Sequence, residues 1–384
     1  MARGEIFTAR VERIAAGGAG IARLNGKSIF IELTAPGDRI RGHIGKEHKN
    51  WAEGELLEIP EASSLRTAPL CPLYGRCGGC SLQHLAYEAQ IDAKRSILAD
   101  AFIRIGGFAP PEIRARQSAP FEYRNRVQFH ANTQASGTNL GFRERKSNRL
   151  VALADCPIAD PGIRNALKEK KIVPPANKDR FNVYSRLTTF LSEGGIEQGR
   201  VSILNRELSM DVKVFFQSNG AMLELLINDL ETAAAAADKG RRLADIYCGV
   251  GTFASFLGAE FQGVDLVEGN SAALTLAREN VRGKRTQYYA LSDTAWVKSL
   301  NARREQPWGF MVLDPPREGL SGPLREYLAR AGPLLVAYVS CDPATLARDS
   351  RVLLAGGYTL KELTLYDFYP QTAHIESLAL FSRR

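Results

Sequence analysis

The sequence predicts an α/β protein whose C-terminal half is a mostly parallel, Rossmann-like sheet with helices on both faces. Three observations support this. From Met222 onward the chain alternates strand-like and helix-like segments, which is typical of parallel sheets. The strand pattern 243–247 leads into a turn that contains Gly249 and Gly251. Residues 1–60, in contrast, hold short strands separated by Gly-rich turns, which favours a small β-barrel.

At 384 residues the chain is long enough for two or three domains with cores of their own. Its 50 Lys and Arg residues outnumber its 42 Asp and Glu residues, and the formal net charge of +8 suits a polyanionic partner. The first residues lack the apolar run of a signal peptide, and no apolar stretch is long enough to cross a membrane. We therefore expect a soluble, cytoplasmic, monomeric protein without a membrane partner.

Residues 1–60 form the first predicted domain, a β-barrel of the kind that binds oligonucleotides. Its strands alternate apolar and polar residues. Basic side chains are distributed along them: Arg10, Arg13, Arg23, Lys27, Arg39, Arg41, Lys46 and Lys49. The alternative is a barrel whose charged face contacts only solvent.

Residues 61–220 form the second predicted domain, which is rich in strands and contains four grouped cysteines, Cys71, Cys77, Cys80 and Cys156. Thiolates are soft ligands that hold zinc or iron-sulfur clusters. Zinc ribbons usually bring two close cysteine pairs, whereas here one Cys-x-x-Cys pair is joined by two single cysteines. We therefore favour a [4Fe-4S] cluster over zinc, with free thiols as a third alternative.

Three other stretches of this domain have clear patterns. Residues 87–105 have a helical periodicity that ends at a Gly pair, and we expect this helix to pack on the C-terminal domain. Residues 161–180, rich in Lys and Pro, are predicted to form a surface loop. Two predicted strands carry basic residues that suit either a phosphate backbone or a solvated rim: Arg124, Arg126, Arg143, Arg145, Lys146 and Arg149.

Residues 221–384 form the predicted C-terminal domain, whose Gly-rich turn indicates a crevice for a nucleoside cofactor. Gly249 and Gly251 let a ligand approach bare backbone, and Asp265, expected to end the next strand, suits a ribose diol. With Ala254 they also match the G-x-G-x-x-A pattern of dinucleotide sites. That pattern is weak by itself, and a tight turn with a structural acid is the alternative.

Reactive side chains are expected at the carboxyl ends of the strands, where ligands bind in parallel sheets. Asp314 ends a buried strand, and Cys341 follows another strand near the start of a helix, so we expect a lowered thiol pKa and a nucleophilic role. His374 and Glu376 precede the last strand, and either can act as a general base. The alternative roles are a turn cap for Asp314, a buried structural position for Cys341 and a solvated side chain for Glu376.

A nucleophilic Cys, a carboxylate base and a crevice for a nucleoside cofactor would, if that cofactor donates a methyl group, suit the methylation of carbon 5 of a pyrimidine. This carbon is a poor nucleophile. Attack of a thiolate on carbon 6 makes carbon 5 enolate-like, so that it can take a methyl group, and a base then removes the carbon 5 proton. The sequence contains a candidate for each part.

The chain resembles the RNA uracil-5 methyltransferases, which make 5-methyluridine in ribosomal and transfer RNA. The resemblance covers nearly the whole chain and rests on the motifs YRNRVQF, FFQSN, DIYCGVGTF, LDPPREG, SCDPATLARD and PQTAHIE. It implies a TRAM-like barrel, a [4Fe-4S] site at the four grouped cysteines and an S-adenosylmethionine-dependent methyltransferase domain. It also implies an RNA partner, 23S rRNA first and tRNA as the runner-up.

The resemblance implies roles for single residues. Cys341 matches the nucleophile and Glu376 the proton-abstracting base. Five residues match positions that bind S-adenosylmethionine: Gln217, Tyr247, Asp265, Asp293 and Asp314. Two residues depart from the family pattern. Asp265 stands where the family more often has Glu. Asp342 replaces the commoner Asn and would raise the pKa of the Cys341 thiol unless its carboxylate points away.

Two other classes of function account for fewer of these residues. An NAD-dependent oxidoreductase would use the Gly-rich turn but would give Cys341, Glu376 and the basic barrel no joint role. A non-catalytic RNA-binding protein with a structural metal site would need only the barrel and the grouped cysteines.

Overall fold

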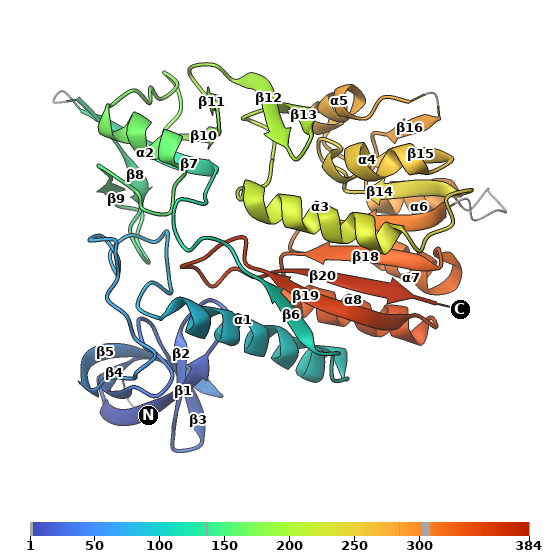
Figure 1. The fold of residues 1–384 in the computed structure, drawn as a ribbon. Coiled ribbons are helices and arrows are strands. Elements are labelled where there is room, and N and C mark those ends of the chain that lie inside the picture. The colour runs from blue at the N-terminus through green and yellow to red at the C-terminus, as the bar shows by residue number, and fades with distance from the viewer. Residues whose placement is uncertain (1–2, 135–136, 284, 301–307, 384) are drawn as a thin grey trace.

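The computed structural model describes residues 3–134, 137–283, 285–300 and 308–383. The chain forms three parts (Figure 1): a small barrel at the N-terminus, a central β-rich part, and a large sheet covered by helices at the C-terminus. In the described part of the chain, no helix is both long and apolar enough to cross a membrane.

The N-terminal part is a closed barrel of five strands in the order β1-β2-β3-β5-β4. The strands are β1 (Ile6–Ile14), β2 (Gly20–Leu24), β3 (Lys27–Ile31), β4 (Arg39–Glu47) and β5 (Trp51–Glu61). Alternate residues of each strand point inward, and Phe7, Val11, Ile29 and Ile44 belong to the barrel's apolar core. The predicted barrel is therefore confirmed.

The central part holds a five-stranded sheet in the order β11-β10-β7-β8-β9 and a separate hairpin of β12 and β13. Its elements are β7 (Arg126–Gln134), β8 (Gly137–Arg143), β9 (Leu150–Ala152), α2 (Pro161–Lys168), β10 (Arg180–Arg186), β11 (Thr189–Ser192), β12 (Gln198–Ile203) and β13 (Arg206–Asp211). The prediction of a loop over residues 161–180 is wrong for its first half. There Asp160 caps α2, and Pro161 occupies the first helical position, where the missing N–H costs nothing.

The C-terminal sheet has eight strands in the order β16-β15-β14-β17-β18-β20-β19-β6. The strands are β14 (Arg242–Ile246), β15 (Gly263–Val267), β16 (Thr286–Tyr289), β17 (Trp308–Leu313), β18 (Leu335–Ser340), β19 (Thr359–Tyr366), β20 (Glu376–Ser382) and β6 (Ile113–Arg116). All pairings are parallel except the two that β20 makes with β18 and β19. The mostly parallel sheet is therefore confirmed.

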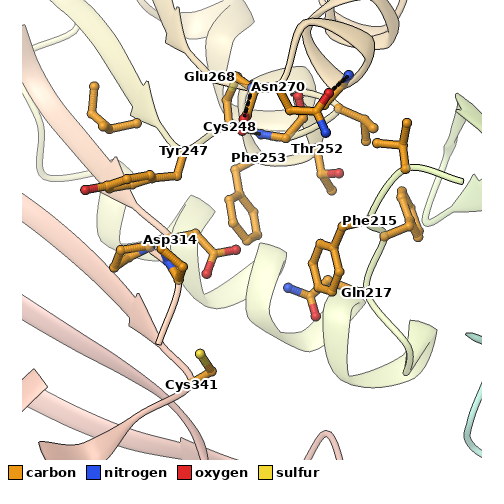
Figure 2. A pocket seen from close by; sticks show the side chains of 18 of the residues that line it. Phe215, Gln217, Tyr247, Cys248, Thr252, Phe253, Glu268, Asn270, Asp314 and Cys341 are labelled. Atoms are coloured by element: carbon orange, nitrogen blue, oxygen red, sulfur yellow. Dashed lines mark hydrogen bonds between the residues drawn. The ribbon is translucent and has the colours of Figure 1, made fainter. Parts of the chain in front are cut away.

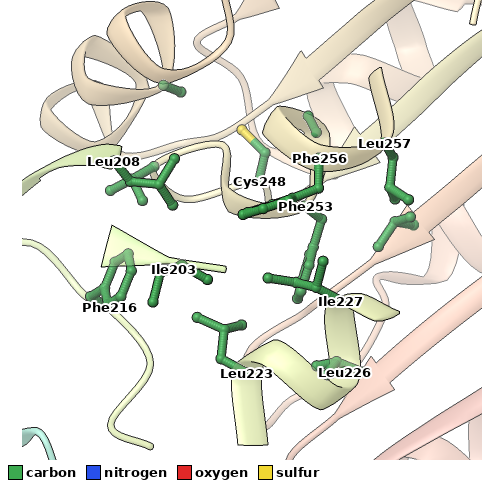
Figure 3. Packing of buried hydrophobic residues seen from close by; sticks show 14 of the residues in the cluster. Ile203, Leu208, Phe216, Leu223, Leu226, Ile227, Cys248, Phe253, Phe256 and Leu257 are labelled. Carbon is green, nitrogen blue, oxygen red and sulfur yellow. The ribbon is translucent and has the colours of Figure 1, made fainter. Parts of the chain in front are cut away.

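Helices cover both faces of this sheet, as predicted. On one face lie α3 (Gly220–Ala234), α4 (Thr252–Leu257) and α5 (Ser271–Asn280). On the other lie α1 (Tyr87–Ala101), α6 (Asp293–Leu300), α7 (Gly322–Ala331) and α8 (Pro343–Ala355). Figure 3 shows how α3 and α4 pack with the β12–β13 hairpin, through side chains such as Leu223, Phe253 and Leu208.

One predicted boundary needs correction. Residues 61–220 were assigned to the central domain, but β6 pairs in parallel with β19 at the edge of the C-terminal sheet, and α1 packs on α8. A π-helical turn (Phe102–Gly106) extends α1 and also contacts α8. The segment 87–116 therefore belongs structurally to the C-terminal layers.

Candidate active site

A cavity of about 750 Å³ lies beyond the carboxyl ends of β14, β15, β17 and β18 (Figure 2). Six of the seven predicted catalytic and cofactor-binding residues line it: Gln217, Tyr247, Asp293, Asp314, Cys341 and Glu376. The seventh, Asp265, is not among its lining residues.

The turn after β14 brings bare backbone to this cavity. Gly249 and Gly251 have φ angles of +53° and +79°, which favour glycine. A Cβ on Gly251 would lie 2.9 Å from Cγ2 of Val281, so this position has no room for a side chain. A Cβ on Gly249 would meet nothing within 4 Å, which leaves that side of the turn open to a ligand.

Asp265 does not line the cavity, and the prediction that it ends its strand is wrong. β15 continues to Val267, so Asp265 lies inside the strand and is 1% exposed. Its carboxylate accepts hydrogen bonds from Nε1 of Trp308 at 2.7 Å and from Nη2 of Arg242 at 2.5 Å. These partners hold Asp265 within the protein interior.

Glu268, which the sequence analysis missed, is the acid that follows β15 at the cavity wall. Its Oε2 accepts a hydrogen bond of 3.0 Å from the backbone N–H of Gly249, and its Oε1 accepts one of 2.7 Å from that of Asn270. The sequence feature that points to Glu268 is the length of the strand. All five residues of β15 are buried, and Glu268 is the first acid beyond them.

Tyr247 and Asp293 form one hydrogen-bonded unit. The Tyr247 hydroxyl donates to Oδ2 of Asp293 at 2.6 Å, and the backbone N–H of Ser321 donates to the same oxygen at 3.1 Å. Burial tends to raise the pKa of Asp293, but the hydrogen bonds from Ser321 and Tyr247 outweigh it and lower the pKa. The carboxylate is thus ionised and fixed at the cavity wall.

Gln217 belongs to the segment between β13 and α3, which Asn125 holds in place. The Asn125 N–H donates to the Ser218 carbonyl, and Oδ1 of Asn125 accepts from the N–H of Gly220, both at 2.7 Å. Gln217 points toward the cavity, and so does Phe215, which is 60% exposed (Figure 2). The sequence analysis missed Phe215, although the buried Phe216 between them indicates an extended segment with 215 and 217 on one side.

Strand pairing brings Cys341 and Glu376 together. β18 and β20 are antiparallel with Ser340 opposite Ser377, so the next pair beyond them is Cys341 and Glu376. Asp314 follows β17, the parallel neighbour of β18 on its other side. Three acidic groups from distant parts of the chain therefore meet at one edge of the sheet.

The surroundings raise the pKa values of all three groups. Burial, with the charges of Glu376 and Asp314, raises the pKa of the Cys341 thiol to about 12, against the opposing effect of Arg317. Burial, with Glu268, raises the pKa of Asp314 to about 7. Burial and Asp314 raise the pKa of Glu376 well above its ordinary value. The predicted lowering of the thiol pKa is therefore wrong.

Asp342 contributes little to this shift because its carboxylate turns toward α8. Its Oδ1 accepts a hydrogen bond of 2.9 Å from the backbone N–H of Thr345 and caps the helix. The Asp at this position is thus a helix cap.

With this geometry, similarity to known proteins decides the family. Residues 196–384 match the tRNA (uracil-5-)-methyltransferase family, and residues 2–57 match the TRAM domain. An uncharacterized RNA methyltransferase of Treponema denticola is 33% identical, over 97% of this chain and 98% of its own length. A 23S rRNA (uracil(1939)-C(5))-methyltransferase of Azoarcus sp. is 31% identical, over 98% and 99%. The chain belongs to the RNA uracil-5 methyltransferases.

The fold agrees with this family along the whole chain. The crystal structure of a Pyrococcus abyssi tRNA (uracil-54, C5)-methyltransferase with S-adenosyl-L-homocysteine superposes with a TM-score of 0.73 at 25% identity, over 98% of this chain and 100% of that one. The chain is therefore an S-adenosylmethionine-dependent RNA uracil-5 methyltransferase. The oxidoreductase and the non-catalytic alternatives are excluded.

The methyltransferase cavity is also lined by Arg124, Arg317, Tyr369 and His374. The Arg124 guanidinium lies 5.6 Å from the centre of the Tyr369 ring, and Nη2 of Arg317 lies 3.4 Å from Nδ1 of His374. Burial and the two arginines lower the pKa of His374 to about 4, so its imidazole is neutral near pH 7. Two guanidinium groups therefore supply the positive charge here.

The basic cluster predicted on the central strands is mostly ion-paired. Arg143 pairs with Asp179, Arg145 and Lys146 pair with Glu32 of the barrel, and Arg149 pairs with Glu144. This favours the alternative, a charged rim, for these four residues. Arg124 lines the cavity, and Arg126 donates to the Val212 carbonyl.

The four grouped cysteines, Cys71, Cys77, Cys80 and Cys156, meet at a second, small cavity. Its apolar lining includes Phe142 and Leu153. Burial, with Cys156 and Cys77 nearby, raises the pKa of Cys80 to about 12. Among the described residues, no group of three or more His, Cys, Asp or Glu side chains is arranged to hold a metal ion. Four thiols around one small cavity are the donor set of a cluster bound by four thiolates. The [4Fe-4S] cluster itself stays a prediction.

Proposed function

We propose that this enzyme methylates carbon 5 of one uridine in 23S rRNA. The observation that carries the proposal is full-length similarity to proteins named as 23S rRNA (uracil(1939)-C(5))-methyltransferases, which are 29% to 31% identical over at least 95% of this chain. A tRNA uridine is the second candidate, because the Pyrococcus abyssi neighbour is named as a tRNA methyltransferase. Cytoplasmic location and a monomeric state remain predictions.

The proposed mechanism uses Cys341 as nucleophile and Glu376 as base. S-adenosylmethionine supplies a methyl group on a positively charged sulfur. The Cys341 thiolate adds to carbon 6 of the uracil, and the C6–S bond makes carbon 5 nucleophilic enough to take the methyl group. Glu376 then removes the proton from carbon 5, and the C6–S bond breaks to return the thiolate.

The raised pKa values support a cationic ligand in this cavity. The thiol must be ionised to attack carbon 6, the Glu376 carboxyl must be ionised to accept the carbon 5 proton, and each negative charge opposes the other. A positively charged sulfonium beside them would offset this repulsion. A methyl donor without a positive charge would leave this repulsion in place.

Five cavity residues are proposed to hold S-adenosylmethionine: Gln217, Tyr247, Glu268, Asp293 and Asp314. Glu268 replaces Asp265 in this set because it stands at the carboxyl end of β15, where a carboxylate suits ribose hydroxyls. The target uridine would have to be flipped out of its stack to bring a ring face to Cys341.

We further propose that Cys71, Cys77, Cys80 and Cys156 hold a [4Fe-4S] cluster with a structural role. The methyl transfer needs no electron, so the chemistry leaves the cluster no redox task. Iron and sulfide analysis of anaerobically purified protein, with zinc measured in the same sample, tests the identity. A methylation rate that followed the redox state of the cluster would contradict the structural role.

The substrate is tested by methyl transfer from labelled S-adenosylmethionine to unmodified 23S rRNA and, separately, to unmodified tRNA. We expect label in 23S rRNA as 5-methyluridine, and none with Cys341→Ala. Label in tRNA alone would keep the chemistry and overturn the proposed substrate.

A further inference from the structure

The segment that precedes the proposed base has little regular structure of its own. Residues 367–375, here called the base loop, connect β19 to β20 and bring Tyr369 and His374 to the cavity, and Glu376, the proposed base, follows as the first residue of β20. Gln371 in this loop has a φ of +66°, a region that residues other than Gly rarely adopt. Contacts from outside the loop must therefore hold its shape.

Helix α1 provides one of these contacts through Lys94. The Lys94 ammonium lies 2.5 Å from Oδ1 of Asp367 and donates to the Tyr369 carbonyl at 3.0 Å. Both charged side chains are 0% exposed. The pair joins residues that are 273 positions apart in the sequence.

The same helix contacts the base loop a second time through Gln90, one turn before Lys94. Nε2 of Gln90 donates to Oε1 of Gln371 at 3.0 Å, and the Gln371 N–H donates to Oε1 of Gln90 at 2.9 Å. Positions 90 and 94 lie on one face of the helix. The two contacts therefore hold both the start and the strained middle of the loop.

Stability alone does not account for a buried ion pair at this place. Apolar residues of similar volume are often as stabilising as a buried pair, because the charges lose their hydration. A buried pair does define one geometry, since its hydrogen bonds are lost when the loop shifts. Neither Lys94 nor Gln90 lines the cavity, so neither can contact a substrate there.

We propose that Lys94, together with Gln90, is a positioning residue that sets the place of Glu376 relative to the carbon 5 proton. The inference rests on the proposed function of Glu376. Two further contacts keep the loop folded without them: the Tyr123 hydroxyl donates to the Pro370 carbonyl at 2.8 Å, and the Ser81 N–H donates to the Gln371 carbonyl at 3.0 Å. Loss of the Lys94 pair should therefore displace the base without unfolding the loop.

A displaced base has a specific consequence, because Glu376 acts after the methyl group has been transferred. Cys341 still adds to carbon 6 and carbon 5 still takes the methyl group. Removal of the carbon 5 proton is then slow, so methylated RNA stays bonded to Cys341. A general loss of structure would reduce this adduct together with the product.

The test is the double variant Lys94→Met with Asp367→Asn, which removes both charges at nearly constant volume. With ordinary substrate RNA and methyl-labelled S-adenosylmethionine, we expect turnover to fall about 100-fold and a labelled protein–RNA adduct to accumulate on a denaturing gel. The affinity for S-adenosylhomocysteine should not change.

The control is Asp100→Asn, which removes an ion pair that joins the same helix to the barrel and does not touch the base loop. We expect normal turnover and no accumulated adduct. Gln90→Leu is the second test variant, and we expect it to accumulate the same adduct in smaller amount. It tests the inference even if the double variant fails to fold.

Folded test variants that turn over normally, or that lose activity without accumulating adduct, would overturn the inference. RNA containing 5-fluorouridine separates this failure from failure of the proposed function, because fluorine at carbon 5 leaves the base no proton to remove. If the wild-type protein forms no adduct with that RNA, the proposed function fails. If it does, and only the variants behave unexpectedly, the positioning role alone is wrong.

Discussion

Cys341 shares its end of the cavity with Glu376 and Asp314, and this neighbourhood decides when the thiol can react. With its pKa raised to about 12, the thiol is protonated near neutral pH in the protein without ligands. A cation placed beside it stabilises the thiolate, by an amount that depends on distance and local polarity.

We therefore expect S-adenosylmethionine to make Cys341 more reactive than S-adenosylhomocysteine does. The two ligands have nearly the same shape, but only the first carries a positive sulfur. Iodoacetamide labelling, followed by mass spectrometry of the Cys341 peptide between pH 7 and 9, measures the difference. Labelling should rise with pH in both complexes and be several-fold faster with S-adenosylmethionine. Equal rates would contradict the electrostatic role of the sulfonium.

At the residue scale, the sequence predicts which groups meet but not what they do to one another. Cys341 and Glu376 stand beside strand patterns, so their place at the sheet edge follows from the alternation of strands and helices. The raised thiol pKa depends on the pairing of β18 with β20 and on Asp314 after β17. Those contacts join distant segments and have no local signal.

At the element scale, the length of β15 decides which acid reaches the cavity. The strand was predicted to end on Asp265 but continues to Val267, so Asp265 is internal and Glu268 reaches the cavity. Strand ends are poorly defined by pattern alone when every residue of the strand is buried, because alternation is then lost.

Matched substitutions of the two acids separate their roles. Glu268→Gln should weaken S-adenosylmethionine binding roughly 10-fold or more, since a charged hydrogen bond to the ligand is lost, and should leave the melting temperature nearly unchanged. Asp265→Asn should lower the free energy of unfolding by about 2 kcal/mol, because Arg242 loses its buried partner, with little change in affinity. Titration calorimetry and thermal unfolding measure both. The reverse pattern would restore Asp265 as the cofactor residue.

At the scale of the whole molecule, the central part and the C-terminal sheet cannot be treated as independent. β6 and α1 come from the segment between the barrel and the central sheet, yet they complete the C-terminal layers. The alternation from Met222 onward predicts the core of this sheet. It could not predict β6, because a strand of four residues with no buried position has no hydrophobic pattern.

The cysteine site is linked to the active site through the residue that follows Cys80. The backbone N–H groups of Ser81 and Leu82 donate to the Gln371 carbonyl, and the Ser81 hydroxyl accepts from the Ala373 N–H at 2.9 Å. These hydrogen bonds join the cysteine segment to the base loop, which leads directly to Glu376.

We therefore expect Cys80→Ser to lose bound iron, to melt at a lower temperature, and to accumulate the same methylated adduct as the Lys94 double variant. Metal analysis and the denaturing gel measure these effects on one preparation. An iron-free Cys80→Ser protein with normal turnover would show that the cysteine site and the base loop are independent.

The most direct test of the account is mass spectrometry of the protein after incubation with S-adenosylmethionine and substrate RNA that contains 5-fluorouridine. We expect one covalent RNA adduct on the peptide that contains Cys341, absent in Cys341→Ala and retained in Glu376→Gln, since only the nucleophile is needed to form it. No adduct with the wild-type protein, or an adduct on another residue, would contradict the proposed mechanism.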